Sequence, residues 1–81
     1  MDVTVKLFAI LKELVERDEL ILSLSGESSA REVRSYLQNE FPSCFSLLSQ
    51  SLIAVNGKYA AEDLILRPGD EVAILPPVSG G

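Results

Sequence analysis

Hydrophobic and polar residues alternate in two stretches near the start of the chain. In residues 2–9 the inward positions are Val3, Val5, Leu7 and Ala9. In residues 19–24 every second residue is a leucine. A period of two predicts a strand with one buried face. We therefore expect two antiparallel strands, with a short turn of helix over residues 11–16 between them.

The next pattern has the period of a helix. Ser29 and Glu32 fit a capping box, in which each side chain satisfies a free backbone N–H at the start of a helix. Apolar residues then recur at three- and four-residue steps, at Ala30, Val33, Leu37 and Phe41. This spacing predicts one helix over residues 30–41, with an apolar stripe that faces a sheet. Pro42 ends it, because the residue before a proline avoids the helical region.

The second half of the chain indicates short strands separated by turns. Residues 43–51 are a serine-rich connection, and three of its apolar residues are expected to cover one end of the core: Phe45, Leu47 and Leu48. Residues 52–55 form a short buried strand, and Asn56-Gly57 after it favours a type I′ hairpin with a return strand over residues 58–60. A turn at residues 67–70 precedes the last strand, over residues 71–75.

The elements follow the order strand, strand, helix, strand, strand, strand. One main helix crossing one face of a mixed sheet of about five strands buries the apolar stripe most simply. This arrangement is an α+β β-grasp fold, the ubiquitin-like architecture. We expect one domain over residues 1–75 and an extended, flexible C-terminal tail over residues 76–81 that ends in Gly-Gly.

Composition narrows the classes of partner. The chain has 81 residues, of which 47% are hydrophobic and 23% charged, which suits one small folded core. Its net charge of −5 is the opposite of the basic footprint that binds nucleic acid or an anionic membrane, so we expect neither partner. A single cysteine builds no disulfide framework, and the N-terminus has no signal-peptide pattern, so we expect a cytoplasmic location.

Few side chains offer chemistry. The sequence contains no histidine, which excludes Ser-His-Asp and Cys-His catalysis. Cys44 has no activating neighbour and is expected to be a small buried hydrophobe. The adjacent carboxylates Asp70 and Glu71 point to opposite faces of a strand, and no clustered ligand set is visible, so we expect no metal site. The isolated glycines form no phosphate loop, so we expect no cofactor on this chain, and another protein binds any ATP that its cycle uses.

The C-terminal tail is the most distinctive feature. Two prolines make a stiff, extended lead to Gly80-Gly81. From Leu75 the tail reaches about 20 Å when extended. Its two glycines have the smallest cross-section that a peptide offers, which suits a narrow channel. The reactive group at its end is the α-carboxylate of Gly81, which becomes an electrophile once it is activated, for example as an acyl-adenylate.

A second feature predicts a docking surface beside the tail. On the first and last strands, the apolar positions facing away from the helix are Phe8, Ala73 and Leu75. Tyr59 is a further candidate. Sheet faces left to solvent are usually polar, so a contiguous apolar strip favours a protein partner.

Several segments together resemble a known family. They are residues 7–9, 12–14 and 54–56, the Pro-Gly-Asp-Glu-Val-Ala sequence of residues 68–73, and the Pro-Pro-Val-Ser-Gly-Gly end of residues 76–81. Over essentially its whole length the chain is similar to the small subunit of molybdopterin synthase, the sulfur carrier of molybdenum cofactor biosynthesis. The Gly-Asp-Glu-Val segment with the Pro-Pro-Val-Ser-Gly-Gly end carries the resemblance, whereas Gly-Gly alone indicates only a ubiquitin-like protein or a sulfur carrier.

The resemblance implies a reaction cycle that needs three protein partners. An adenylating activating enzyme uses ATP to form an acyl-adenylate on Gly81, and a sulfur-donor enzyme converts it to a thiocarboxylate. The large subunit of molybdopterin synthase, which forms a heterotetramer with this subunit, then receives the tail. Sulfur passes to cyclic pyranopterin monophosphate to form the molybdopterin dithiolene, and the large subunit supplies the catalytic side chains.

The resemblance also implies the roles of individual residues. Gly81 bears the thiocarboxylate, and Gly80 gives it access. The implied partner-binding positions are Phe8, Lys12, Tyr59, Leu75, Pro76, Pro77 and Val78. Lys12 stands where the family often has arginine, and a lysine lacks the planar fork that makes a bidentate contact.

Three alternatives stay open from the sequence. The first is the thiamine-pathway sulfur carrier, which is usually shorter and lacks the Pro-Pro-Val lead. The second is a ubiquitin-like modifier that is conjugated to protein lysines. The third is a β-grasp interaction module whose tail is incidental.

Overall fold

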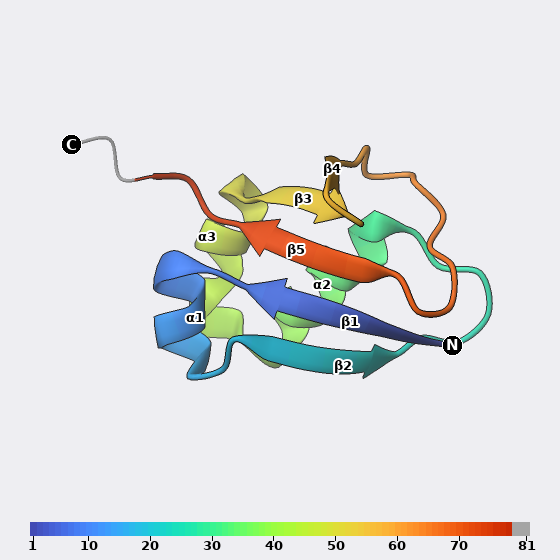
Figure 1. Cartoon of the computed structure of the whole chain (residues 1–81). Coiled ribbons are helices and arrows are strands. Elements are labelled where there is room, and N and C mark those ends of the chain that lie inside the picture. Colours follow the sequence, from blue (N-terminus) through green and yellow to red (C-terminus); the bar gives the residue numbers. More distant parts are fainter. Residues whose placement is uncertain (79–81) are drawn as a thin grey trace.

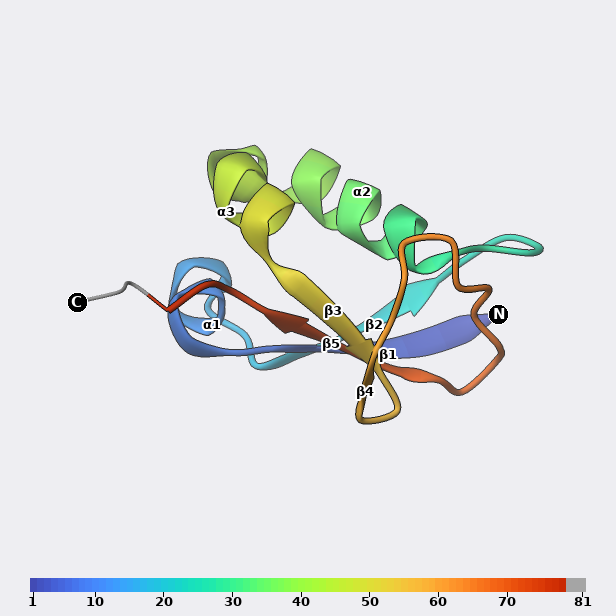
Figure 2. The same ribbon diagram turned by 90° about the horizontal axis from the view of Figure 1, so that it is seen from above.

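The structure, a computed structural model that describes residues 1–78, is a five-stranded sheet with helix α2 across one face (Figures 1 and 2). The strands are β1 (Asp2–Leu7), β2 (Glu19–Ser23), β3 (Leu52–Val55), β4 (Lys58–Tyr59) and β5 (Glu71–Leu75). The helices are α1 (Ala9–Val15), α2 (Ala30–Glu40) and α3 (Phe45–Gln50), and a short 3-10 turn, η1 (Pro42–Cys44), precedes α3.

The strand order places β5 at the centre of the sheet. Across the sheet the order is β2-β1-β5-β3-β4. Strand β5 pairs in parallel with β1 and antiparallel with β3, and the two outer pairs are antiparallel. This mixed sheet crossed by one main helix confirms the predicted β-grasp fold. The segment that follows β5 therefore starts from a strand that is hydrogen-bonded on both sides.

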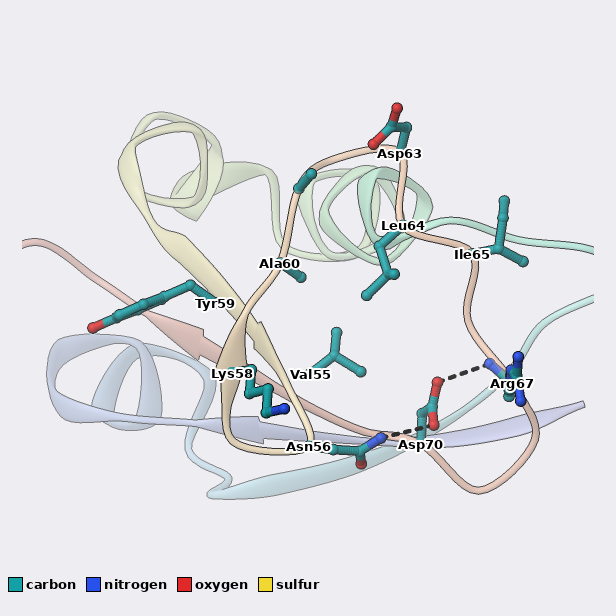
Figure 3. A pocket seen from close by; sticks show the side chains of 11 residues that line it. Val55, Asn56, Lys58, Tyr59, Ala60, Asp63, Leu64, Ile65, Arg67 and Asp70 are labelled. Carbon is teal, nitrogen blue, oxygen red and sulfur yellow. Dashed lines mark hydrogen bonds between the residues drawn. The ribbon is translucent and has the colours of Figure 1, made fainter.

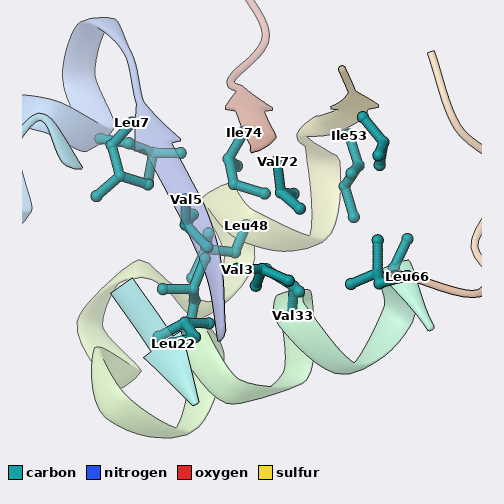
Figure 4. Packing of buried hydrophobic residues seen from close by; sticks show 14 of the residues in the cluster. Val3, Val5, Leu7, Leu22, Val33, Leu48, Ile53, Leu66, Val72 and Ile74 are labelled. Atoms are coloured by element: carbon teal, nitrogen blue, oxygen red, sulfur yellow. The ribbon is translucent and has the colours of Figure 1, made fainter. Parts of the chain in front are cut away.

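Helix α2 begins at the predicted capping box. The backbone N–H of Ser29 donates to the Glu32 carboxylate at 2.7 Å, which satisfies a donor that the first turn leaves free. Its stripe of Ala30, Val33 and Leu37 is buried against the sheet. The inward side chains of the strands complete the core shown in Figure 4; they include Val3, Val5, Leu7, Leu22, Ile53, Val72 and Ile74.

The first strand is shorter than predicted. Ala9, expected on its inward face, is exposed and begins α1, with a left-handed φ of 52°. The position that the sequence assigned to Ala9 is filled from the helix instead. Leu11 and Val15, four residues apart, share one face of α1, and Leu11 is completely buried.

The connection after α2 is helical rather than irregular. Pro42 ends α2 as predicted, but the chain continues through η1 into α3. Leu48 is buried and Leu47 partly buried, as expected, whereas Phe45 is exposed, so its predicted place in the core is wrong. The helical spacing explains this difference, because Cys44 and Leu48 are four residues apart on the inward face and Phe45 is turned away from it.

The turns of the second half agree with the sequence. Asn56 and Gly57 both have positive φ, 51° and 86°, as a type I′ hairpin requires. Arg67 and Asp70 close the next turn, where the Asp70 N–H donates to the Arg67 carbonyl at 3.1 Å.

No helix among residues 1–78 is long and apolar enough to cross a bilayer. The division into a domain of residues 1–75 and a tail of residues 76–81 stays a prediction, because residues 79–81 lie outside the described part.

Candidate functional site

The tail leaves the sheet from the end of its central strand (Figure 1). Leu75, the last residue of β5, pairs with Leu52 of β3. Beyond it Pro76 is half-buried, whereas Pro77 and Val78 are exposed. The start of the tail is therefore fixed by main-chain pairing, and its direction is set by two prolines with restricted backbones.

Helices α1 and α3 lie on either side of the start of the tail. A hollow of about 660 Å³ at this point is lined by Ala9, Ile10, Leu47, Gln50 and residues 76–78. Most of these side chains are apolar, so the surface around the tail offers contact area to a protein partner. Gly80 and Gly81, the predicted carrier end, lie outside the described residues, and their roles stay predictions.

An apolar surface lies beside the tail on the face of the sheet away from α2. We call it the apolar sheet face, and it consists of Phe8, Leu52, Tyr59, Ala73 and Leu75. The register places Leu52 opposite Leu75, and Ala54 opposite both Ala73 and Tyr59. Tyr59 is 75% exposed and Leu52 58% exposed. The structure thus brings together the four apolar residues singled out from the sequence, with Phe8 at the end of β1 nearest Leu75.

Leu52 is the member of this face that the sequence analysis missed. The run from Leu52 to Val55 is apolar at every position, so its period of two is invisible and the strand was expected to be buried throughout. In the structure Ile53 and Val55 are buried, and Leu52 faces outward. The pairing of Leu52 with the last residue of β5 is the only signal that would have revealed its position, and a pairing requires the sheet register.

Lys12 lies apart from the centre of the apolar sheet face. It is exposed on α1 and shares a hollow of about 320 Å³ with Phe8, Asp18 and Glu19. The structure therefore places Lys12 near one predicted contact residue, Phe8, and away from Tyr59. It leaves the lysine at the edge of the surface, where a charged side chain stays in water while its stem covers apolar area.

Charged residues border the apolar sheet face on the side of β1. Lys6 and Glu71 form an ion pair at 3.4 Å, and Lys6 stands opposite Ala73 in the sheet. Both side chains are well exposed, so the pair contributes little to stability. It does separate the apolar sheet face from the outer strand β2.

A third hollow, of about 640 Å³, lies between the β3–β4 hairpin and the segment of residues 60–70 (Figure 3). Asp70 is the centre of its hydrogen bonds. Asn56 donates to the Asp70 carboxylate at 2.9 Å, and the Arg67 backbone N–H donates to the same carboxylate at 2.8 Å. The hydrogen bond from Arg67, and then that from Asn56, lower the pKa of Asp70. This hollow fixes the turn before β5, and we assign it no chemistry.

The described residues offer no catalytic constellation. Within residues 1–78 no three acidic or cysteine side chains are grouped as a metal site would need. The lone thiol, Cys44, is 2% exposed and belongs to the core, as the sequence predicted. The described residues present the start of the tail and an apolar surface beside it.

The comparison with protein families agrees with that arrangement. The model of the ThiS family matches residues 5–81. The chain belongs to the ThiS family. A molybdopterin synthase sulfur carrier subunit from Dictyostelium discoideum is 38% identical over 78 residues, which cover 93% of this chain and 91% of that protein. The resemblance inferred from the sequence is confirmed.

Two solved structures are similar to this ThiS-family chain. One is the small archaeal modifier protein 1 of Methanosarcina acetivorans, with 30% identity, a TM-score of 0.81 and coverage of 99% of this chain and 96% of that one. The other is a complex of subunits 1 and 2 of the molybdopterin-converting factor of Helicobacter pylori 26695. Its matching chain has 27% identity, a TM-score of 0.72 and full coverage of both chains.

Proposed function

We propose that this chain is the sulfur-carrier subunit of a molybdopterin synthase. Its membership of the ThiS family and the name of its Dictyostelium relative support this proposal. The structural observation that carries it is the origin of the tail, which starts from the central strand of the sheet with an apolar surface beside it. A carrier needs these two features, because it must present its end to other proteins while its own fold stays fixed.

The proposed cycle activates the α-carboxylate of Gly81. A carboxylate oxygen attacks the α-phosphorus of ATP, pyrophosphate leaves, and the acyl-adenylate forms in the site of the activating enzyme. Hydrosulfide released by a sulfur-donor enzyme then attacks the acyl carbon, the bond to AMP breaks, and a thiocarboxylate remains. Gly80, which has no side chain, lets the end of the tail enter the narrow sites in which both steps occur.

The sulfur is then delivered to cyclic pyranopterin monophosphate in the site of the large subunit. The related structure from Helicobacter pylori is a complex of subunits 1 and 2 of its molybdopterin-converting factor, which supports such docking here. We assign the contact to the apolar sheet face, to Lys12 at its edge, and to Pro76, Pro77 and Val78 as the lead of the tail. Because the large subunit supplies the catalytic side chains, the lack of histidine in this chain is expected.

The test is whether changes at the end of the tail abolish sulfur transfer and leave the fold unchanged. We expect deletion of Gly81, or the addition of one alanine after it, to abolish molybdopterin formation in a reconstituted reaction with unchanged thermal unfolding. An added N-terminal alanine is the control, since the N-terminus lies at the end of the sheet away from Leu75, where the tail begins (Figure 1). Molybdopterin formation by either C-terminal variant would contradict the proposal.

The relative from Methanosarcina acetivorans favours a second candidate, because it is described as a modifier protein. In that case the activated Gly81 forms an amide with a lysine amine of a target protein, and AMP leaves. Branched peptides that carry the C-terminal residues of this chain on a lysine, found by mass spectrometry of cell extracts, would support the modifier function. A thiamine-pathway sulfur carrier would deliver its sulfur to a different acceptor. The same reconstituted reaction therefore distinguishes it, because it would not form molybdopterin from cyclic pyranopterin monophosphate.

A further inference from the structure

The two edges of the sheet differ in how they are protected. Strand β4 is only two residues long and carries Lys58, and short, charged edges resist pairing with other chains. Strand β2 has five residues, and Ile21 at its centre is 66% exposed. A long edge with an exposed apolar residue is a template for an added strand.

The hydrogen bonds to β1 show which groups of β2 face outward. Met1 and Leu24 exchange both backbone hydrogen bonds, each at 2.7 Å, and the Leu7 N–H donates to the Asp18 carbonyl at 2.9 Å. In an antiparallel pair such bonded positions alternate along the strand. The even-numbered residues of β2 therefore bond to β1. The N–H and C=O groups of Glu19, Ile21 and Ser23 point to the free edge.

We propose that this edge pairs with the same edge of a second copy of the chain, around a two-fold axis at Ile21. In this register Ile21 faces Ile21 of the second copy, and Glu19 faces Ser23 of the second copy. Every outward N–H and C=O group of these three residues then has a hydrogen-bond partner. The result is one continuous sheet made of two copies.

The side chains of β2 are self-complementary in this register. On the face away from α2, the side chains of Ile21 meet across the two-fold axis, and each Glu19 side chain lies opposite Ser23 of the second copy. No two like charges are therefore directly opposite. Thr4 and Lys6 of β1 stand beside Ile21 and Glu19 in the same rows. On the helix side, a hollow of about 420 Å³ runs along the edge, and its lining combines apolar side chains with the charged Arg17 and Glu40. This complementarity favours a second copy over an unrelated segment.

The pairing leaves the proposed function of the chain intact. Because the two β2 strands are antiparallel, the two β5 strands are antiparallel as well, and the tails leave in opposite directions. Strand β1 and the Lys6–Glu71 ion pair lie between β2 and most of the apolar sheet face, and only Phe8 shares a hollow with Glu19 at the start of β2. The inference therefore does not depend on the identity of the large subunit or on the chemistry of Gly81.

The expected dimer is weak and depends on salt. One pair of five-residue edges covers less area than stable complexes, which bury about 1,200 Å² or more. We expect a dissociation constant between about 0.1 and 1 mM. Each copy carries a net charge of −5, so added salt should screen the repulsion and strengthen the dimer.

The test is a dilution series of the isotope-labelled full chain, followed by NMR and by sedimentation. Concentration-dependent shifts should be confined to the amides of Glu19, Ile21 and Ser23 and their neighbours. A mixture of labelled and unlabelled chains should show a contact between the α-protons of Leu20 and Leu22 across the dimer, because their α-carbons would be about 4.5 Å apart. A chain that stays monomeric at about 1 mM would overturn the proposal, and so would shifts that lie on the apolar sheet face instead.

Substitutions at the two-fold axis test the register itself. Ile21→Lys and Ile21→Glu each place like charges opposite each other, so each variant alone should dissociate about tenfold more readily, or more. Mixing the two variants should restore association, because lysine then faces glutamate. Ile65→Lys, a change at another exposed isoleucine, is the control and should leave association unchanged. Failure of the mixture to associate, or β2 shifts that appear only when a different protein is added, would overturn pairing between copies.

Discussion

Leu52 gives the sharpest test of the apolar sheet face. It is 58% exposed, and it lies opposite Leu75 at the point where the tail begins. If this face docks on the large subunit, the partner covers the part of Leu52 that the fold leaves exposed. Truncation to alanine should therefore weaken docking, and the structure sets the size of the effect.

The magnitude follows from burial. Full burial of a leucine side chain stabilises by about 1.5–3 kcal/mol. Covering the exposed 58% of Leu52 then contributes about 0.9–1.7 kcal/mol to the free energy of docking. Because Leu52→Ala loses this contribution, its dissociation constant for the large subunit should be about 5- to 20-fold higher than that of the wild type. Leu52→Ala also loses the part of the side chain that the fold already buries. This loss should lower the free energy of unfolding by about 0.6–1.3 kcal/mol, which corresponds to a fall in Tm of about 3–10 °C.

Leu14→Ala is the matched control. Leu14 is 55% exposed, on α1 and outside the apolar sheet face, so its truncation removes the same groups and costs a similar amount of folding stability. Both variants and the wild type are titrated calorimetrically with the large subunit at 25 °C, where all three should be folded. Equal affinities for Leu52→Ala and the wild type would refute the reasoning, as would an equal loss for Leu14→Ala.

Three further predictions concern the scaffold. Ser29→Ala should lower the free energy of unfolding by about 1 kcal/mol through loss of the capping box, measured by urea denaturation, and an unchanged midpoint would contradict it. Ile74→Ala, at a core position of β5 that is 1% exposed, should cost about 2–5 kcal/mol in the same assay, and a cost below about 1 kcal/mol would argue against a packed core there. Because hydrogen bonds lower the pKa of Asp70 below the usual 3.8, its carboxylate stabilises the fold above that pH and the benefit is lost as the pH falls through the folded-state pKa. The stability difference between wild type and Asp70→Ala should therefore shrink on acidification, and a difference that stays constant with pH would contradict this cause.

The sequence predicted most of the fold because its local signals agree with each other. The capping box at Ser29, the Asn56-Gly57 hairpin and the alternation around Val5 each specify one element, and all fit one sheet with one main helix. The errors lie where local patterns are ambiguous. Ala9 continues the alternation of β1, but the helical spacing of Leu11 and Val15 ends the strand. The serines of α3 concealed a helix, because serine favours turns when it is considered alone.

The candidate site could be predicted only in part, for a different physical reason. Phe8, Ala73 and Leu75 were identified because they alternate with buried residues along the first and last strands, whereas Tyr59 was a further candidate that no alternation specified. Leu52 was missed because a fully apolar strand shows no alternation, and only its pairing with β5 reveals its outward face. The exposed edge at Ile21 was also missed, since which strand lies at the edge of a sheet depends on strand order and not on local pattern.

Intact-mass analysis tests the central claim most directly. The full chain is incubated with ATP, the adenylating enzyme and the sulfur-donor enzyme of the same cell, and fragmentation locates any change in mass. The account predicts a gain equal to the difference between sulfur and oxygen, located on Gly81 and removed when the large subunit and cyclic pyranopterin monophosphate are added. An unchanged mass, or sulfur located on Cys44 instead of the terminal carboxylate, would contradict it.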